Sequence, residues 1–240
     1  MVKISERLRT AAGLIGEGER LADVGTDHGY VPIYLVERKR IPSAIAMDIR
    51  TGPLERAREH IRMYGMEDYI QTRLSDGVAA LKPGETDTIL IAGMGGGLVI
   101  HILESGRVIC EQAHGLVLQP QSELPKVRRF LRENGYVTER EEMVMEDGKY
   151  YPMMRVHFDA SAVSHADSFT EEQELEFRYG KQLLTEKHPV LLAYLRWEVQ
   201  IQQDILTQLS GQPATEQIAA RIDAVKQILA QNARALAYYE

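Results

Sequence analysis

Short apolar runs alternate with longer amphipathic stretches along the first two thirds of the chain. Each run is bounded by glycine, proline or an acid, as buried strands are, and the runs cover residues 20–24, 44–48, 70–75, 87–92 and 115–119. Helical patterns fill the gaps between them. Because strands joined by crossover helices lie parallel in one sheet, this order predicts an open α/β sheet.

Two of the helical stretches carry clear end signals. Residues 51–65 and 122–135 are expected to form helices, with Thr51 and Ser122 as the capping residues. Beyond them, residues 136–145 and 149–158 are strand-like and are joined by a Glu-Asp-Gly turn, which predicts an antiparallel hairpin. The expected sheet is therefore mostly parallel, with an antiparallel hairpin at its C-terminal end.

A small, polar segment at residues 161–168 marks a domain boundary, so we expect domains at 1–160 and 166–240. In the second domain, apolar positions step by three and four in two series that Gly211 and Pro213 separate. This pattern predicts an antiparallel, coiled-coil-like helical hairpin, whose simplest role is packing or weak dimerisation. The hairpin has more acidic than basic residues, which argues against a broadly basic clamp.

Composition narrows the class of protein. The chain has 240 residues, 44% apolar and 26% charged, with no apolar stretch of the roughly 20 residues that a membrane span needs and no signal-peptide pattern. The single cysteine, Cys110, excludes an internal disulfide and suits a reducing cytoplasm. Since the net charge is −7, a nucleic-acid partner would have to bind a local basic patch.

The turn after the first predicted strand points to a cofactor. Its spacing is Gly25, Asp27, Gly29, so a carboxylate stands where a dinucleotide site would place a phosphate. That carboxylate would repel a pyrophosphate, which disfavours an NAD-dependent oxidoreductase. S-adenosylmethionine has no phosphate and carries a positive sulfonium and ammonium, which an acidic turn attracts.

Acids also close the next two predicted strands. Asp48 occupies the position where doubly wound folds bind the ribose hydroxyls, and Asp76, followed by Gly77, suits the adenine amino group. Each acid alone could be a helix cap or a turn former, but together they predict one binding crevice. The fourth strand ends in the glycine-rich stretch 92–97, which would let bare backbone approach a flat ligand.

These motifs carry a specific resemblance. LADVGTDHGY, the AMDI that holds Asp48, SDG, ILIAGMGG and LQPQSE together resemble the bacterial tRNA (adenine-22-N1)-methyltransferase family over residues 1 to about 160. The helical hairpin is similar to the coiled-coil extension of that family. The resemblance implies a class I, Rossmann-like methyltransferase fold, S-adenosylmethionine as donor, no metal, and methyl transfer to N1 of a tRNA adenine.

Carried over by motif position, a set of residues is expected to bind the cofactor. They are Asp23, Gly25, Thr26, Asp27, His28, Gly29, Asp48, Ile49, Asp76, Gly77, Gly93, Met94 and Gly95.

Asp27 and Tyr30 are the expected catalytic residues. Adenine N1 has an in-plane lone pair and needs no proton removal, so positioning supplies most of the catalysis. The methylated base is cationic, and a carboxylate at Asp27 would stabilise the developing charge, while Tyr30 could stack or donate a hydrogen bond. N1 lies on the pairing edge, so a paired target must be turned out of its helix.

Contacts to tRNA are expected from local basic clusters, although most charge runs are simply solvated faces. The candidates are Arg7, Arg9, Lys126, Arg128, Arg129 and Arg132. We expect a cytoplasmic monomer or weak dimer. Three alternatives remain open on the residues alone: a methyltransferase for another RNA, a small molecule or a protein; an NAD-dependent oxidoreductase; and a non-catalytic adaptor.

Overall fold

The computed structural model describes residues 1–164, 168–213 and 215–240. The chain forms two compact units, Met1–Ser168 and Phe169–Glu240, which are described separately. The boundary expected at 161–168 falls partly on residues 165–167, outside the described part of the chain.

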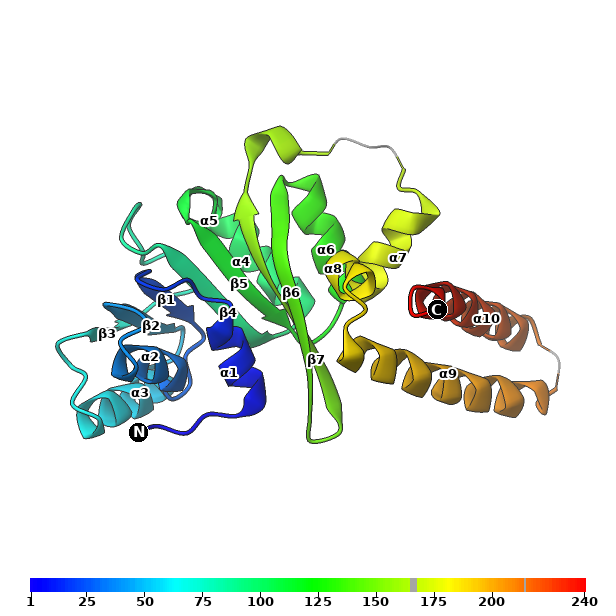
Figure 1. The fold of residues 1–240 in the computed structure, drawn as a ribbon, viewed down its shortest axis with the longest axis horizontal. Helices are drawn as coiled ribbons and strands as arrows, with labels where there is room; N and C mark the ends of the chain where they lie inside the picture. The colour runs from blue at the N-terminus through cyan, green and yellow to red at the C-terminus, as the bar shows by residue number, and fades with distance from the viewer. Residues whose placement is uncertain (165–167, 214) are drawn as a thin grey trace. The chain divides into compact units, whose positions relative to one another are not determined.

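The first unit is built on a seven-stranded sheet in the order β3-β2-β1-β4-β5-β7-β6 (Figure 1). Neighbours among the first five strands pair in parallel, whereas β7 is antiparallel to both β5 and β6. The strands are β1 Leu21–Val24, β2 Ala44–Asp48, β3 Ile70–Leu74, β4 Thr88–Met94, β5 Gly115–Pro120, β6 Tyr136–Glu146 and β7 Lys149–Phe158. The predicted mostly parallel sheet with a terminal hairpin is confirmed.

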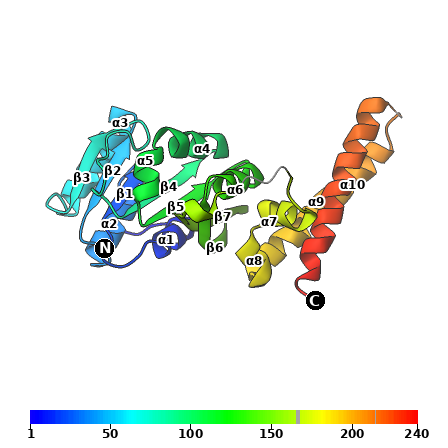
Figure 2. The same cartoon turned by 90° about the horizontal axis from the view of Figure 1, so that it is seen from above.

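Two hydrophobic layers enclose the sheet. Side chains alternate between its faces, so Leu116 and Leu118 pack into one layer and Val117 into the other. The first layer is covered by α4 Gly96–Ser105, α5 Arg107–Gln112 and α6 Leu124–Glu133. The second is covered by α1 Glu6–Gly13, α2 Tyr30–Glu37 and α3 Thr51–Met63, and Figure 2 shows α1 and α2 across the sheet from α4 and α6.

Both expected helix caps differ from prediction. The N-cap of α3 is Arg50, and Thr51 is the first helical residue. The N-cap of α6 is Glu123, in the left-handed region at φ 53°. The hydroxyl of Ser122 instead accepts a hydrogen bond from the Gly96 N–H at 3.2 Å. A short polar residue near a helix start can equally well satisfy a donor on another element, and sequence does not distinguish the two.

The fourth strand is longer than expected because it contains a bulge. It continues past residue 92 to Met94, with its register to β5 shifting between Ala92 and Met94. Gly93 lies at this shift with φ +79°, a conformation that L side chains rarely adopt.

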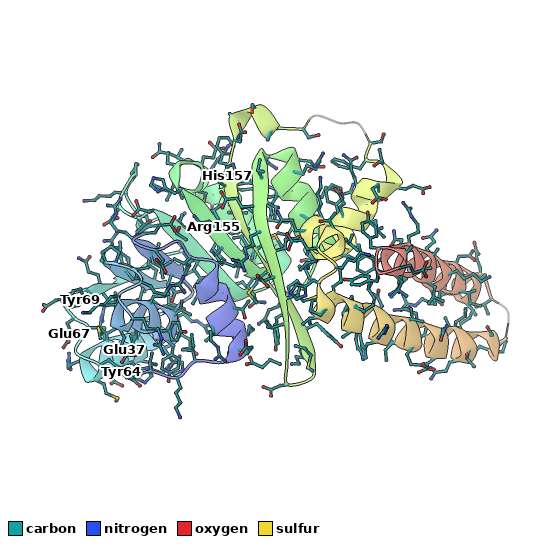
Figure 3. The ribbon with its side chains drawn as sticks, in the orientation of Figure 1. Glu37, Tyr64, Glu67, Tyr69, Arg155 and His157 are labelled. Atoms are coloured by element: carbon teal, nitrogen blue, oxygen red, sulfur yellow. The ribbon has the colours of Figure 1, made fainter. Side chains whose placement is uncertain are left out.

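An ion-pair network lies at the opposite end of the sheet, where β1 and β6 begin and β7 ends. Arg155 on β7 contacts Glu19 with Nη2 at 2.8 Å and Glu139 with Nε at 2.8 Å. His157, two residues along the same strand, lies 2.8 Å from Glu139 (Figure 3). Hydrogen bonding to Arg155 and Thr88 outweighs burial and lowers the pKa of Glu19. The network ties the terminal hairpin to the segment that precedes β1.

The second unit is helical. Its helices are α7 Glu171–Tyr179, α8 Lys181–Thr185, α9 Pro189–Ser210 and α10 Glu216–Ala237. Helices α9 and α10 pack against each other as the predicted hairpin. The spacing of apolar residues in the sequence did not predict α7 and α8 as separate helices. No helix among the described residues is long and apolar enough to cross a bilayer.

A buried carboxylate organises this second unit. Glu198 is 5% exposed and accepts hydrogen bonds from Arg178 at 2.8 Å, Tyr179 at 2.7 Å and Tyr194 at 3.0 Å. Asn232, which falls within the predicted apolar series of α10, donates to it at 2.9 Å. The polar position in the heptad-like pattern therefore has a defined partner on α9, which fixes how the two helices align.

Candidate active site

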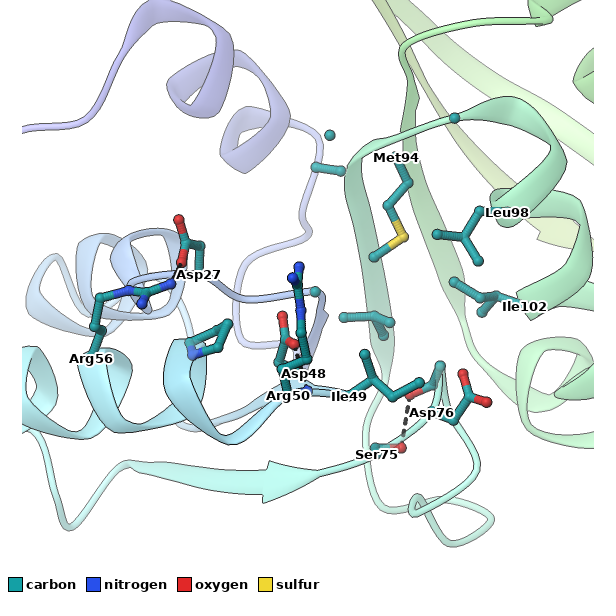
Figure 4. A pocket seen from close by; sticks show the side chains of 17 residues that line it. Asp27, Asp48, Ile49, Arg50, Arg56, Ser75, Asp76, Met94, Leu98 and Ile102 are labelled. Atoms are coloured by element: carbon teal, nitrogen blue, oxygen red, sulfur yellow. Dashed lines mark hydrogen bonds and ion pairs between the residues drawn. The ribbon is translucent and has the colours of Figure 1, made fainter.

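A crevice at the carboxyl ends of the parallel strands has a volume of about 770 Å³. Its walls come from the ends of β1, β2, β3 and β4 and from the first two turns of α3 and α4 (Figure 4). In doubly wound sheets, ligands bind at this edge where the strand order reverses, here between β1 and β4. We call this crevice the larger pocket.

Carboxylates at successive strand ends line the larger pocket. Asp48 accepts a hydrogen bond from the Arg50 N–H at 2.8 Å, so its side chain is held at the end of β2. Asp76 lies in the turn after β3, which Ser75 orders by donating to the Gly77 carbonyl at 2.8 Å. The structure thus brings together the acids that the sequence placed in one crevice.

Apolar side chains provide two facing surfaces in the same pocket. Ile49 is 58% exposed after β2, and Leu98 is 48% exposed on α4. Leu98 and Ile102 lie one helical turn apart with Met94 beside them, as Figure 4 shows. Exposed aliphatic groups on opposite walls would hold a flat ring between them.

The turn from β1 to α2 forms another wall. Gly25 has φ +77°, a left-handed conformation that L side chains rarely adopt, so the turn requires glycine here; a Cβ would also lie 2.2 Å from the Met94 Cε, at the end of a flexible side chain. The N–H groups of Gly25 and Thr26 donate to the Met47 carbonyl at 2.8 Å, which ties the turn to β2. Gly29, at φ 68°, begins α2.

Asp27 projects from this turn and is ion-paired with Arg56 of α3 (Figure 4). The side-chain hydrogen bond from Arg56 is the main cause that lowers the pKa of Asp27 below its usual range. The second carboxylate oxygen lies 3.3 Å from the His28 Nε2. Asp27 is therefore an anion at neutral pH.

A smaller pocket of about 350 Å³ opens beside the first, on the side of α1 and α2. Asp23, Thr26, Tyr30 and Gln121 contribute polar groups to its lining. Asp23 is 7% exposed, and burial raises its pKa to about 6. The Thr26 side chain lies beside Asp23, and its hydrogen bond to the carboxylate partly opposes that rise in pKa.

The two pockets share a wall. Gly25, Asp27, Ala92 and Gly93 line both of them. Three of these residues present only main chain or a methyl group, so groups bound on the two sides would meet with little protein between them. This arrangement suits direct transfer of a small group from one ligand to another.

The segment after β5 supports the glycine-rich loop. The Gln119 side-chain oxygen accepts from the Gly93 N–H at 3.2 Å. Ser122 binds the Gly96 N–H, as described above, and Glu123 accepts from the Gly97 N–H at 3.0 Å. The LQPQSE motif thus holds the start of α4 and the shared wall in place.

Arg7 faces the smaller pocket from α1. Its Nη1 donates to Gln119 at 2.8 Å, and its guanidinium lies 5.4 Å from the centre of the Tyr151 ring. The sequence predicted a tRNA contact for Arg7 but did not foresee that the residue lines a pocket. Gln119 is fully buried; it belongs to the LQPQSE motif, but it was not among the predicted site residues.

Three rings cluster at the entrance to α2. His28, Tyr30 and His60 lie 5.0–5.1 Å apart by their ring centres, with nearly parallel planes. His60 also contacts the His28 carbonyl at 3.1 Å. Tyr30 is thus held by its neighbours while it lines the smaller pocket.

The predicted basic cluster on α6 is only partly exposed. Arg128 is 8% exposed and its Nε donates to Glu141 at 2.9 Å, so the expectation that it belongs to a surface patch is wrong. Arg132 is exposed, and Lys126 is exposed with Glu123 3.4 Å away. Arg9, on α1, is exposed and ion-paired with Glu6.

Several pocket residues were not predicted. They are Arg50, Pro53, Arg56, Ser75, Leu98 and Ile102. Most of them lie at the start or in the first two turns of the helices that follow β2 and β4, which face the crevice in any doubly wound sheet, and that rule could have identified them. Among the described residues, no group of three or more His, Cys, Asp or Glu side chains is placed to hold a metal ion.

Comparison with known proteins agrees with this geometry. The family described as "Methyltransferase domain" matches residues 4–154. A curated relative, the tRNA (adenine(22)-N(1))-methyltransferase of Bacillus subtilis (strain 168), is 34% identical over 236 residues, covering 95% of this chain and 98% of its own.

Solved structures of related proteins superpose over nearly the whole chain. The B. subtilis M1A22 tRNA methyltransferase TrmK has a TM-score of 0.82 at 31% identity, covering 98% of this chain and 100% of that one. Streptococcus pneumoniae Sp1610, a putative tRNA (m1A22) methyltransferase solved in complex with S-adenosyl-L-methionine, has a TM-score of 0.79 at 32% identity, covering 95% and 100%.

Proposed function

Because the chain belongs to the tRNA (adenine(22)-N(1))-methyltransferase family, we propose that it transfers the methyl group of S-adenosylmethionine to N1 of adenine 22 in tRNA. The observation that carries this function is the wall shared by the two pockets. It separates a crevice suited to an adenosine cofactor from one large enough for a planar base.

The larger pocket fits S-adenosylmethionine. Asp48 stands at the end of β2, where it would accept hydrogen bonds from the ribose hydroxyls, and Asp76 would accept one from the adenine amino group. Ile49 and Leu98 would hold the adenine ring. The bound cofactor supplies an electrophilic methyl group on a sulfonium, and the acidic lining favours its positive charge.

The smaller pocket would hold the target base. Adenine N1 is unprotonated near neutral pH, so the protein needs to orient its lone pair and does not need to remove a proton. The methylated base is cationic, and Asp27 lies on the shared wall where it would stabilise that charge. Tyr30 would contact the ring from α2.

The tRNA itself requires basic contacts outside the pockets. We assign these to Arg9, Lys126, Arg129 and Arg132, with Arg7 at the pocket mouth. A net charge of −7 makes such local contacts necessary. The enzyme would act on cytoplasmic tRNA, as a monomer or weak dimer.

A methylation assay tests this function. Labelled S-adenosylmethionine would be incubated with an unmodified tRNA transcript, and with the same transcript carrying guanine at position 22. We expect 1-methyladenosine in the first and no incorporation in the second. Equal incorporation in both, or methylation of another RNA or a small molecule only, would overturn the assignment.

A further inference from the structure

A third pocket lies at the opposite end of the sheet from the two pockets described above. Its volume is about 530 Å³, within the range of pockets that hold small ligands. Its walls come from the end of α2 and from the segments that precede β1, β2 and β3, so it adjoins the amino ends of these strands. We call it the distal pocket, and its lining includes Glu37, Lys39, Arg40, Ile41, Met66 and Tyr69.

Two cations enter the distal pocket from the turn that ends α2. Lys39 follows the C-cap in the left-handed region at φ 56°, and its N–H donates to the Val36 carbonyl at 2.8 Å. Arg40 is half-buried and donates through Nη2 to the Ile15 carbonyl at 3.1 Å. Neither side chain has a carboxylate partner within the described part of the chain. A partly desolvated cation without a counter-charge favours a nearby anion.

The acid in the lining does not compensate these cations, because it has other partners. Glu37 accepts a hydrogen bond from the Val2 N–H at 3.0 Å and also pairs with the neighbouring Arg38. Glu67 and Asp68 are exposed just before β3, but they do not line the pocket. Because the free cations come from one segment and the exposed acids adjoin another, a phosphate would bind beside the turn that ends α2.

An exposed aromatic ring contributes the apolar part of the lining. Tyr69 is 51% exposed just before β3, and Figure 3 shows it at the same end of the unit as Glu37. Met66 and the buried Ile41 also line the pocket. Proteins that bind single-stranded RNA combine such rings, on which bases stack, with cations that contact the phosphates. The distal pocket brings both kinds of group together.

We propose that the distal pocket binds one unpaired nucleotide of the tRNA, with its phosphate at Lys39 and Arg40 and its base against Tyr69. This inference rests on the proposed function and deepens it. The pocket and Asp48 lie at opposite ends of β2, whose 5 residues span about 17 Å. A stacked strand covers that distance in about five nucleotides, so one RNA strand can reach both sites.

Binding of an unmodified tRNA transcript, measured by fluorescence anisotropy over a range of salt concentrations, tests the inference. Tyr69→Ala should weaken binding roughly tenfold, the scale of one stacked base, whereas Tyr69→Phe should retain it because the ring is kept. Lys39→Met should also weaken binding, and it should lower the slope of log binding constant against log salt concentration by about one.

Two further measurements separate this contact from the chemical step and from misfolding. The single-turnover methylation rate at saturating tRNA should be unchanged in each variant, because the distal pocket does not touch the reacting atoms. The KM for tRNA should rise with the loss of affinity. Unchanged calorimetric binding of S-adenosylhomocysteine would show that each variant is folded.

Arg38→Met provides the matched control. Arg38 adjoins Lys39 in the sequence and is exposed, but its guanidinium lies 3.8 Å from the centre of the Tyr34 ring and does not line the pocket. Removing this charge should leave tRNA affinity within about twofold, because only the general attraction between a basic surface and RNA is reduced.

Two results would overturn the inference. One is unaltered tRNA affinity in either Tyr69→Ala or Lys39→Met, which would leave the pocket to a free small molecule. The other is an equal loss of affinity in Arg38→Met, which would show that the position of the charge does not matter. If the unsubstituted protein binds and methylates tRNA, either result refutes only this inference; if it binds no tRNA, the proposed function fails as well.

Discussion

Replacing Asp27 by Asn tests whether its charge acts in methyl transfer. The substitution keeps the size of the side chain and removes the negative charge on the wall that both pockets share. Its cost to folding should be small, since Asp27 and its partner Arg56 are both well exposed. The effect should therefore appear in the reaction and not in the amount of folded protein.

The magnitude follows from the surroundings of the carboxylate. Loss of one preorganised electrostatic group typically lowers kcat by about 10²–10³-fold. Water and the neighbouring Arg56 screen Asp27, which places the expected loss near the lower limit, about 10²-fold or roughly 2.7 kcal/mol in activation free energy. Because Arg56 lowers the pKa of Asp27, the unsubstituted enzyme should show no loss from its protonation above about pH 5.

Single-turnover methylation at saturating cofactor and tRNA is the appropriate assay. Saturation removes the weaker cofactor binding that loss of the Asp27 charge would also cause, so the remaining deficit belongs to the chemical step. A rate close to that of the unsubstituted enzyme under these conditions would refute the catalytic role. Asp27 would then serve only to bind the cofactor.

The remaining predictions concern the ribose site, the basic surface, a buried acid and the second unit. Asp48→Ala should weaken S-adenosylmethionine binding by about 1–3 kcal/mol in calorimetry, and unchanged affinity would remove it from the site. Replacing Lys126 and Arg132 together by Ala should raise the KM for tRNA without changing cofactor affinity, and should reduce the slope of log binding constant against log salt concentration by about two. An unchanged KM and slope would show that the tRNA binds another surface. Burial raises the pKa of Asp23 from 3.8 to about 6, so the folded protein binds the carboxyl proton more tightly than the unfolded chain does. The stability that this proton contributes is present below about pH 4 and is lost as the pH rises from about 4 through 6. Asp23→Asn should match the unsubstituted protein at about pH 4 and be about 2–3 kcal/mol more stable at pH 8 in urea denaturation, whereas a pH-independent difference would contradict the assignment. Glu198→Ala should destabilise the helical unit by about 3–5 kcal/mol. Unfolding can be followed by the fluorescence of the chain's one tryptophan, which lies on α9. An unchanged denaturation midpoint would show that the buried hydrogen-bond network does not stabilise the unit.

The strands and the acids at their ends could be predicted because both depend on local patterns. Buried strands have a distinctive composition, and parallel strands bring their carboxyl ends to one edge, so the positions of Asp48 and Asp76 in one crevice followed. The bulge at Gly93 could not be predicted, because it depends on how β4 pairs with β5. Arg128 was misplaced because neighbouring cations on one short helix conceal which of them faces inward. Its partner, Glu141, lies on a strand 13 residues away.

The cofactor class could be predicted from the glycines and acids of the first turn, and the family from the resemblance of five motifs, whereas the residues that contact Asp27 could not be predicted. Arg56 lies 29 residues from Asp27, and nothing in the local sequence connects them. Likewise, the hydrogen bond from the Gly93 N–H to the Gln119 side chain joins two different strands and has no signal in the local sequence. Contacts between elements that are distant in the chain require the packed sheet, and such contacts determine the charge and position of the residues that we propose to act.

The backbone character of the wall between the pockets has a consequence for how this enzyme could change its acceptor. Side chains can be exchanged one at a time, but the path of a main chain through a bulge and a left-handed turn is set by the whole sheet. Gly25 has φ +77°, a conformation that strains any L side chain, so that half of the wall resists remodelling by a single substitution. With the base in the smaller pocket, as proposed, new acceptor preferences would have to arise on its far side, in α1 and α2, while the donor side stays unchanged. A family built in this way can diversify in the nucleotide it modifies without losing its cofactor.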